Sequence, residues 1–247
     1  MEDGAEKREL GIFVPAYEAG QTLDTLLRRI PEAVWEKVKV LAVIDDGSHD
    51  ETSQIVRHWM KKKKEMVLER FPENRGYGAA VRRGLAICRQ ENCKQAVCLH
   101  ADGQYPPEQI MLALQTMSDR GWDLLQGSRH LGGTALQGGM PLYKYLAGKW
   151  LTLMENFCFG IRLTDYHSGF LVYHENSLQL IPFEKLSGYF DFDLEVIATA
   201  CAKGLKVGEM AIPTRYAGEI SHLNPWRYGV HVLVVLLRYL RGHYARL

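Results

Sequence analysis

The chain has 247 residues, of which 47% are hydrophobic and 24% are charged, and its formal net charge at pH 7 is +1. This composition supplies a full hydrophobic core, so it excludes a largely disordered chain and favours one globular domain. The near-neutral charge gives no reason to expect nucleic-acid binding, and we interpret the lysine run at 61–64 as the solvated end of a surface helix.

Short apolar runs alternate with helical patterns through the first half of the chain. Strands are predicted at 10–14, 38–44, 66–71, 95–99 and 123–127, and helices at 22–30, 52–63, 79–89 and 107–118. Such alternation is typical of an α/β protein with a mostly parallel central sheet flanked by helices.

The second half of the sequence is less regular. It contains a glycine-rich segment at 132–139, an amphipathic stretch at 142–159 and a long helix after Pro225. We see no linker and no internal repeat. The sequence therefore predicts a single domain over residues 1–247, with a core at about 10–225 and an amphipathic C-terminal helix at about 226–247.

Two polar loops follow the second and third predicted strands. The first presents Asp45 and Asp46, and carboxylates accept hydrogen bonds from ribose hydroxyls and base N–H groups. An ordinary turn with Asp50 capping the next helix is the alternative. The second loop places Gly76 and Gly78 at the start of a helix, which permits close approach of a ligand. It lacks the third glycine of the dinucleotide fingerprint, so NAD binding is not expected.

The run from His100 through Asp102 to Gln104 is the most informative one in the chain. It follows the fourth predicted strand, and alternate side chains of an extended segment point to one side. The imidazole, carboxylate and amide are therefore expected to converge at the carboxyl end of this strand, where α/β proteins bind ligands. These groups suit a partly hydrated divalent cation whose coordination is completed by substrate phosphates.

Further polar candidates lie later in the sequence. Arg129 follows the fifth predicted strand and is suited to pair with a phosphate. Asp165 is compatible with an acid or base held in a polar turn. Arg215 and His222 add a guanidinium and an imidazole. Each has an ordinary structural explanation when taken alone, such as an exposed surface arginine.

Taken together, the motifs resemble the family 2 glycosyltransferases of GT-A fold over about residues 10–238. The motifs, in chain order, are PAYEAGQTL, DDGSHDET, NRGYGAA, HADGQYPPE, GSRHLGG, LTDYHSGF and PTRYAGEISHLNP. They are most similar to the branch that includes dolichyl-phosphate mannose synthases and bacterial polyprenyl-phosphate glycosyltransferases. The resemblance implies a Rossmann-like sheet and inverting transfer of a hexose from a UDP- or GDP-linked sugar to a polyprenyl phosphate.

Two other functions remain open. One is a soluble glycosyltransferase that acts on a saccharide or small-molecule hydroxyl. The other, from a different class, is a noncatalytic subunit that binds a nucleotide sugar. A hydroxyl acceptor needs a base, for which Asp165 is the best candidate. A lipid phosphate has a second pKa of about 6 and is already mostly ionised near neutral pH, so Asp165 then only orients groups.

The resemblance also assigns individual residues. The nucleotide-sugar pocket would be formed by Pro15, Ala16, Tyr17, Glu18, Asp45, Asp46, Gly76, Ala101, Arg129 and Arg215. A divalent metal, Mn²⁺ or Mg²⁺, would be held by His100, Asp102 and Gln104. The catalytic residues would be Asp102, Arg129 and Asp165. The acceptor phosphate would be bound by Lys144, Ser168, Arg215 and His222.

One position departs from the family pattern. The metal motif is usually Asp-x-Asp, and its first position here is His100. An imidazole in place of a carboxylate favours Mn²⁺ over Mg²⁺. It also makes metal binding weaken as the imidazole protonates, near pH ~6.5 if its pKa is unperturbed. Alternatively, His100 is no ligand, and Asp102 alone anchors a largely hydrated metal.

The termini and the cysteines indicate where the protein works. The five cysteines include no CxxC pair, so neither a disulfide framework nor a structural zinc site is expected, and a reducing cytoplasm fits. The charged N-terminal segment argues against a secretory signal. The longest uncharged apolar stretch is about half of the ~20 residues that a spanning helix needs, so no transmembrane helix is expected. The C-terminal helix either lies peripherally in the membrane interface or packs on the core.

Overall fold

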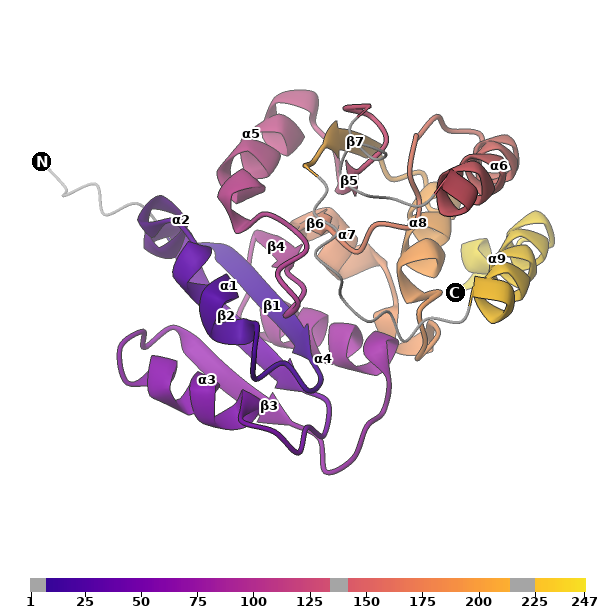
Figure 1. The fold of residues 1–247 in the computed structure, drawn as a ribbon. Coiled ribbons are helices and arrows are strands. Elements are labelled where there is room, and N and C mark those ends of the chain that lie inside the picture. Colours follow the sequence, from indigo (N-terminus) through magenta and orange to yellow (C-terminus); the bar gives the residue numbers. More distant parts are fainter. Residues whose placement is uncertain (1–7, 134–141, 214–224) are drawn as a thin grey trace, which may run out of the picture.

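The computed structural model describes residues 8–133, 142–213 and 225–247 (Figure 1). Its centre is a seven-stranded sheet in the order β3-β2-β1-β4-β6-β5-β7. The strands are β1 (Leu10–Ala16), β2 (Val38–Asp45), β3 (Met66–Arg70), β4 (Gln95–Cys98), β5 (Leu124–Ser128), β6 (Leu171–His174) and β7 (Val207–Ala211). Every pairing is parallel except those of β6 with β4 and β5. The prediction of a mostly parallel α/β sheet is confirmed.

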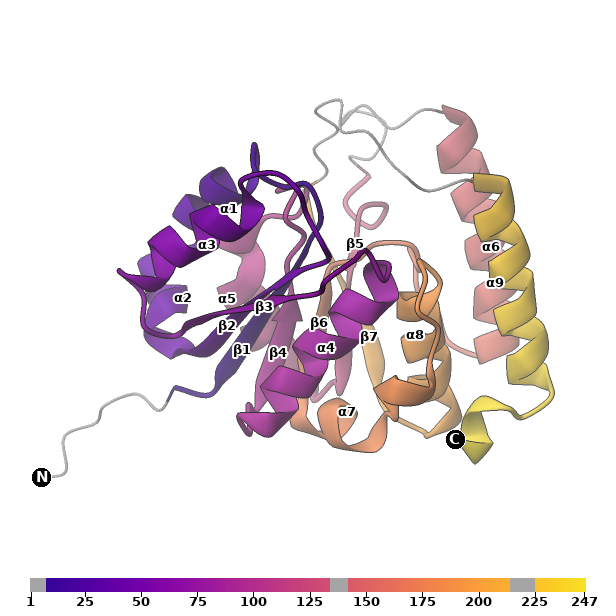
Figure 2. The ribbon, with the colours of Figure 1, turned by 90° about the horizontal axis from the view of Figure 1, so that it is seen from below.

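Helices cover both faces of this sheet (Figure 2). One face carries α1 (Leu23–Arg29), α2 (Glu32–Lys37), α3 (Thr52–Met60) and α5 (Ile110–Arg120). The other face carries α4 (Tyr77–Gln90), α7 (Glu175–Leu180) and α8 (Phe192–Ala202). The long helices α6 (Leu142–Phe159) and α9 (Pro225–Leu240) pack together outside α8. Short 3-10 turns lie at Pro107–Gln109, Phe183–Lys185 and Tyr244–Arg246.

Each face of the sheet builds its own hydrophobic core. Phe13 of β1 enters the core that contains α4 and α8, whereas Ile12 and Val14 enter the core that contains α1 and α5. Both faces are therefore buried, which explains why the central strands are continuous apolar runs rather than alternating ones. Helix α5 ends at Gly121, whose left-handed conformation (φ 60°) closes the helix.

The structure contains five elements that the sequence pattern does not predict: α2, β6, α7, α8 and β7. Helix α8 is buried on all sides from Phe192 to Ala200, so no polar stripe marks its helical period. Strand β6 has only four residues. The helices predicted at 142–159 and after Pro225 are present, whereas the glycine-rich segment lies mostly outside the described residues.

Strand β6 determines how the two halves of the chain meet. It lies between β4 and β5 and runs against both, with Val172 opposite Val97 on one side and Leu125 on the other. The amino end of β6 therefore lies at the same edge as the carboxyl ends of β4 and β5. The segment just before it, which includes Asp165 and Ser168, is thereby brought to this edge.

Candidate active site

Most of the polar motifs gather at one edge of the sheet. Strands β1, β2, β4 and β5 run in the same direction, so their carboxyl ends at Ala16, Asp45, Cys98 and Ser128 share an edge. The loops that follow these strands lie there, together with the loop before β6. This edge is where open α/β sheets bind their ligands.

Asp45 and Asp46 build the loop in which they lie. Asp45 is fully buried, and its carboxylate accepts hydrogen bonds from the backbone N–H of Ser48 (2.8 Å) and from the Ser53 hydroxyl. The Asp46 carboxylate accepts from the backbone N–H groups of Arg75 (2.7 Å) and Gly76 (2.9 Å). Burial raises the pKa of Asp46, and these two N–H groups oppose that rise. These two hydrogen bonds join the loop after β2 to the loop after β3.

The glycines of the second loop serve this packing within the protein. A Cβ on Gly78 would lie 2.7 Å from the carbonyl carbon of Gly188 and 2.8 Å from the Ser187 oxygen. Gly76 has a φ of 92° and faces the same segment. Their close approach is therefore to residues 187–189, and the approach of a ligand to this loop stays a prediction.

The loop after β1 carries an exposed tyrosine and is hydrogen-bonded to the loop after β2. Glu18 adopts a left-handed conformation (φ 49°), and its N–H donates to the Ser48 hydroxyl at 2.9 Å. Its carboxylate accepts from the N–H of His49 at 2.9 Å. Pro15 and Ala16 are largely covered, whereas Tyr17 is 44% exposed. The turn alternative for Asp50 is also seen, because this carboxylate accepts from the N–H of Thr52 at the start of α3.

The metal-type motif is a turn, so the expected extended segment is wrong. The N–H of Gly103 (φ 71°) donates to the His100 carbonyl at 3.1 Å, and the N–H of Gln104 donates to the Asp102 carboxylate at 2.9 Å. The side chains therefore project from a turn, and not from alternate positions of a strand, yet the Asp102 carboxylate still interacts with the His100 imidazole. Ala101 is buried within this turn, and Asp102 and Gln104 are half-buried.

The imidazole of His100 is held by aromatic side chains. Its Nε2 lies 3.0 Å from the hydroxyl of Tyr77, which also donates to Asp193 at 2.7 Å. The ring of Tyr105 meets it edge-on with centroids 4.8 Å apart. Burial lowers the pKa of His100, the Asp102 carboxylate raises it, and Arg129 lowers it. His100, Asp102 and Arg129 therefore share one electrostatic environment, and the imidazole protonates below the pH of 6.5 expected for an unperturbed group.

Arg129 is positioned by Asp165 through a bidentate ion pair. The Nε and Nη2 atoms of the arginine lie 2.7 and 3.1 Å from the two carboxylate oxygens. Asp165 is only 1% exposed. Burial alone would raise the pKa of this carboxyl, but the guanidinium outweighs it and holds the pKa well below the usual range. Asp165 is consequently a poor proton acceptor, because it stays ionised and both of its carboxylate oxygens accept hydrogen bonds from Arg129.

The residues expected to bind the acceptor phosphate are described only in part. Ser168 is 1% exposed, and its hydroxyl accepts from the N–H of Phe170 at 3.3 Å. Arg215, His222 and the side chain of Lys144 lie outside the described residues. The structure therefore shows a Ser168 hydroxyl that already has a partner inside its own loop.

The donor set suits a hydrated divalent cation better than a closed protein cage. Within the described residues, no three or more His, Cys, Asp and Glu side chains form a group able to hold a metal. Mg²⁺ and similar ions often take only one or two protein carboxylates and complete their shell with substrate phosphates and water. Asp102 can supply one such carboxylate, with the His100 imidazole and the Gln104 amide nearby in sequence.

Several polar residues of the site have no signal in the sequence motifs. Asp193 lies on α8, which the sequence pattern does not predict, and burial raises its pKa to about 7. Glu155 of α6 is fully buried, and its Oε2 lies 3.5 Å from Nε2 of His167. His167 also contacts the Tyr228 hydroxyl of α9 at 2.9 Å. Of these residues, Tyr77 and His167 fall inside motifs already singled out, NRGYG and LTDYHSGF.

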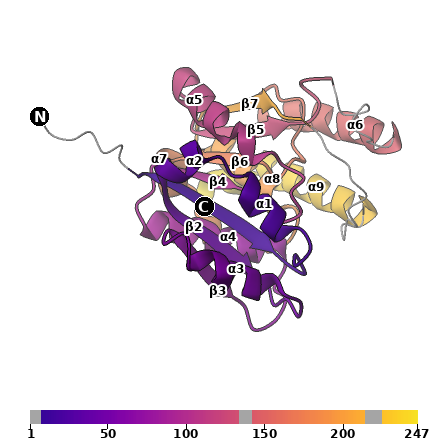
Figure 3. The same cartoon turned by 60° about the vertical axis from the view of Figure 1, so that its left-hand side comes forward.

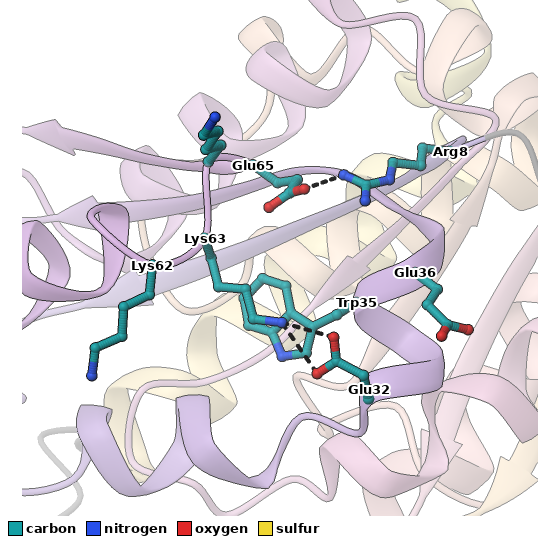
Figure 4. A pocket seen from close by; sticks show the side chains of 8 residues that line it. Arg8, Glu32, Trp35, Glu36, Lys62, Lys63 and Glu65 are labelled. Atoms are coloured by element: carbon teal, nitrogen blue, oxygen red, sulfur yellow. Dashed lines mark hydrogen bonds and ion pairs between the residues drawn. The ribbon is translucent and has the colours of Figure 1, made fainter. Parts of the chain in front are cut away.

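A shallow charged pocket lies at the opposite edge, near the amino ends of β1 and β3 (Figure 4). Lys63 pairs with Glu32 at 3.0 Å and lies 4.7 Å from the centroid of the Trp35 ring. Arg8 pairs with Glu65. Because these opposite charges pair with each other, away from the motif loops, we do not include this pocket in the candidate site.

Comparison with known proteins identifies the family. The model of the family described as "Glycosyl transferase family 2" matches residues 11–181, which include the loops after β1, β2, β4 and β5. The chain belongs to glycosyl transferase family 2. The resemblance seen in the sequence motifs is thereby confirmed, and the protein is a glycosyltransferase by family.

Two relatives of this glycosyltransferase are named for transfer to dolichyl phosphate. The UDP-N-acetylglucosamine–dolichyl-phosphate N-acetylglucosaminyltransferase of Methanococcus voltae is 22% identical over 217 residues, which cover 83% of this chain and 85% of the relative. The dolichyl-phosphate beta-glucosyltransferase of Saccharomyces cerevisiae is 28% identical over 229 residues, covering 82% of this chain and 66% of the relative.

A solved structure shares the fold. Glucosyl-3-phosphoglycerate synthase of Mycobacterium tuberculosis, crystallised with Mn²⁺, UDP and phosphoglyceric acid, aligns with a TM-score of 0.67 at 16% identity. The alignment covers 94% of this chain and 78% of the other. This similarity confirms the GT-A type of α/β fold for the family 2 glycosyltransferase.

Proposed function

We propose that this family 2 glycosyltransferase transfers a hexose, with inversion, from a UDP- or GDP-linked sugar to a polyprenyl phosphate, while bound peripherally to the cytoplasmic face of a membrane. An oxygen of the acceptor phosphate attacks the anomeric carbon, and the bond from that carbon to the nucleoside diphosphate breaks. The names of the two dolichyl-phosphate relatives support the acceptor class.

The observation that carries the proposal is an apolar face on α6 and α9. These helices lie side by side at the end of the molecule away from β3 (Figure 3). Large apolar side chains with 39–88% exposure line them: Leu142, Tyr143, Leu146, Trp150, Leu153 and Phe157 on α6, and Val230, Leu233, Val234, Leu237 and Leu240 on α9. Exposed large apolar side chains gathered on two neighbouring helices are typical of a binding surface for a membrane or a partner.

This apolar face is joined to the catalytic edge. The side chain of Asn156 on α6 exchanges hydrogen bonds of 2.8 and 2.9 Å with the backbone of Leu163, two residues before Asp165. Tyr228 on α9 contacts His167, two residues after Asp165, at 2.9 Å. A lipid phosphate held at the membrane surface would therefore meet the Arg129 and Asp165 pair.

The state of Asp165 favours a phosphate acceptor over a hydroxyl. A sugar hydroxyl needs a base that accepts its proton, and a carboxylate held ionised by Arg129 is poorly suited to that task. A lipid phosphate needs no base, because its second pKa is about 6. Asp165 then acts as a positioning residue that directs the guanidinium of Arg129 toward phosphate groups.

On the donor side, the residues offer a base platform and a charge-stabilising group. Tyr17 follows Ala16, whose carbonyl accepts from the N–H of Asp46 at 2.8 Å, and its exposed ring is a candidate on which a nucleoside base can stack. A divalent cation, held by Asp102 with His100 and Gln104, would neutralise charge on the leaving diphosphate when bound. We assign the remaining charge stabilisation to Arg129, with Arg215 as a further candidate.

The proposal is tested by nucleoside-diphosphate release from UDP- and GDP-sugars with Mn²⁺ or Mg²⁺. Each reaction is run with polyprenyl phosphate and, separately, with the matching polyprenol that lacks the phosphate. We expect release only with the phosphate, and its loss in Asp102→Asn. Equal release with a saccharide and no lipid would support the hydroxyl-acceptor alternative. Nucleotide binding without turnover would support a noncatalytic subunit.

A further inference from the structure

A chain of hydrogen bonds behind the metal-type motif ends on His100. The hydroxyl of Tyr77 lies 2.7 Å from Oδ2 of Asp193 and 3.0 Å from Nε2 of His100. Asp193 is 8% exposed, and Phe190 stacks on the Tyr77 ring with centroids 5.7 Å apart. These contacts link Tyr77 at the start of α4 to His100 after β4 and to Asp193 on α8.

Counting protons along this chain fixes the form of the imidazole. The Tyr77 hydroxyl has one hydrogen, and with the Asp193 carboxyl ionised, as at the pH 8 of the test below, it donates this hydrogen to the carboxylate. The same oxygen then faces Nε2 of His100 as an acceptor, so Nε2 carries the hydrogen. A neutral imidazole has only one N–H group, and Nδ1 is therefore left with its lone pair.

The other ring nitrogen is available to a ligand. Within the described part of the chain, Nδ1 of His100 has no hydrogen-bond partner. The ring cannot easily turn, because a Cβ on the adjacent Gly169 would lie only 2.2 Å from Nε2, and Tyr105 packs edge-on against the ring. The carboxylate of Asp102 acts on the same imidazole electrostatically.

We propose that Tyr77 and Asp193 are positioning residues that hold His100 as the Nε2-protonated tautomer, so that Nδ1 binds the divalent cation together with Asp102. The inference rests on the proposed function, since that cation arrives with the nucleoside diphosphate. Histidines that bind metals generally donate their second ring N–H to a partner that orients the ring and raises its basicity.

This arrangement explains how a histidine can stand where the family motif has a carboxylate. A carboxylate offers lone pairs in every ionised state, whereas a neutral imidazole offers one only in the correct tautomer. The substitution at position 100 therefore requires an acceptor for the second nitrogen. The hydroxyl oxygen of Tyr77, whose hydrogen is donated to the ionised Asp193 carboxyl, supplies that acceptor.

The test compares Tyr77→Phe with Tyr173→Phe, using Mn²⁺ with UDP or GDP as the probe. Tyr173 is a matched control, because it is fully buried in the same half of the protein and its hydroxyl has no partner among the described residues. Pulsed electron paramagnetic resonance detects nitrogen bonded directly to Mn²⁺. We expect a nitrogen signal in the unmodified protein and in Tyr173→Phe that is lost in His100→Asn.

The affinity for Mn²⁺ in the presence of nucleotide should fall about 10–100-fold in Tyr77→Phe and Asp193→Asn, and stay unchanged in Tyr173→Phe. In the metal-free protein at pH 8, nitrogen-15 spectra of labelled histidine should show His100 protonated at Nε2. His100→Asn identifies its resonances. Tyr77→Phe should remove the preference for this tautomer.

Three results would overturn the inference. They are an Nδ1-protonated His100 in the metal-free protein, no nitrogen signal from His100 while Mn²⁺ and nucleotide are bound, and an unchanged Mn²⁺ affinity in Tyr77→Phe. Failure of the proposed function is a separate result, because it would appear in calorimetry as no binding of any nucleoside diphosphate. The metal-free spectra test the tautomer in either case.

Discussion

The ion pair between Arg129 and Asp165 is the residue-scale feature that most constrains the chemistry. Sequence reasoning gives each of these residues a separate task, a phosphate contact and a proton transfer. The structure joins them at 2.7 Å and buries the carboxylate. We therefore propose that Asp165 acts through Arg129, because a buried carboxylate that stays ionised keeps its guanidinium partner fixed.

Replacing Asp165 by asparagine should destabilise the protein by about 3–5 kcal/mol, because it breaks the largely buried ion pair with Arg129. Urea unfolding at pH 7 measures this loss. Asp102→Asn is the control, and it should change the stability by less than about 1 kcal/mol, since the amide can still accept the hydrogen bond from Gln104.

The same variant distinguishes a positioning role from a base. The pKa of Asp165 lies well below its usual range, so this carboxyl should contribute no acid limb to the pH profile of kcat/KM. Residual activity of Asp165→Asn should keep the shape of the unmodified profile. A variant of unchanged stability whose profile loses an acid limb would show that Asp165 is the base after all.

Asp193 should make stability depend on pH. Burial raises its pKa to about 7 in the folded protein, against about 3.9 in an unfolded chain. The unfolded state then binds fewer protons between these values, so the stabilisation is present below pH ~4 and is lost as pH rises through ~7. The loss is on the order of 4 kcal/mol.

Urea unfolding of the unmodified protein and of Asp193→Asn, at pH 5 to 8, measures this dependence. As the pH rises, the free energy of unfolding of Asp193→Asn should increase relative to that of the unmodified protein, because asparagine does not titrate. Asp119→Asn, which removes an exposed carboxylate from α5, controls for the loss of a charge. Parallel curves for all three proteins would contradict the assignment.

Part of the site could be predicted at this scale, because the loops after β1, β2, β4 and β5 must share an edge of a parallel sheet. The hydrogen-bond partners of the site residues could not be predicted from the sequence. Tyr77 and Asp193 are 116 positions apart, and no local pattern links them. Likewise, the spacing of His100, Asp102 and Gln104 fits an extended strand, but this segment forms a turn. Gly103 there adopts a left-handed conformation, which the spacing of the polar residues does not reveal.

At the scale of elements, the first half of the chain follows the sequence pattern and the second half departs from it. The early strands and helices have clear periodicity, and turn residues separate them. Helix α8 is buried all round, and β6 is a four-residue strand that pairs in the antiparallel sense. Neither has a local signature, because tertiary packing alone selects them.

The close packing of α4 on the 187–189 segment can be tested at Gly78. A Cβ there would lie 2.7 Å from backbone of Gly188, so Gly78→Ala should destabilise the protein by about 1–3 kcal/mol. Gly229 on α9 has open space around it, and Gly229→Ala should instead stabilise the protein by about 0.5–1 kcal/mol. Equal effects of the two substitutions in thermal unfolding would argue against this close packing of α4 on residues 187–189.

The exposed apolar side chains of α6 and α9 allow the proposed membrane contact to be tested by substitution. Trp150→Glu combined with Leu237→Glu should weaken binding to anionic lipid vesicles about 100-fold, because two exposed apolar side chains no longer enter the lipid. Stability should change by less than about 0.5 kcal/mol per site. Leu112→Glu on α5 is 52% exposed on another surface and should not alter vesicle binding. Equal loss in both proteins would exclude this face as the membrane contact.

At the scale of the whole molecule, the polar edge and the apolar helices are parts of one arrangement. The loop that carries Asp165 is bonded to α6 through Asn156 and to α9 through Tyr228. In the described part of the chain, no helix is both long and apolar enough to cross a bilayer. In the proposed function, α6 and α9 lie along the membrane surface and bring the polar edge of the sheet to lipid headgroups.

In the proposed reaction, a lipid phosphate accepts the sugar. Its most direct test is transfer of labelled sugar from the nucleotide donor to polyprenyl phosphate in vesicles, followed by lipid extraction and mass analysis. The account predicts a glycosyl phosphate lipid that forms with the unmodified protein and is lost in Asp102→Asn. Label that stays in the aqueous phase on a saccharide, with no lipid product under any donor, would contradict it.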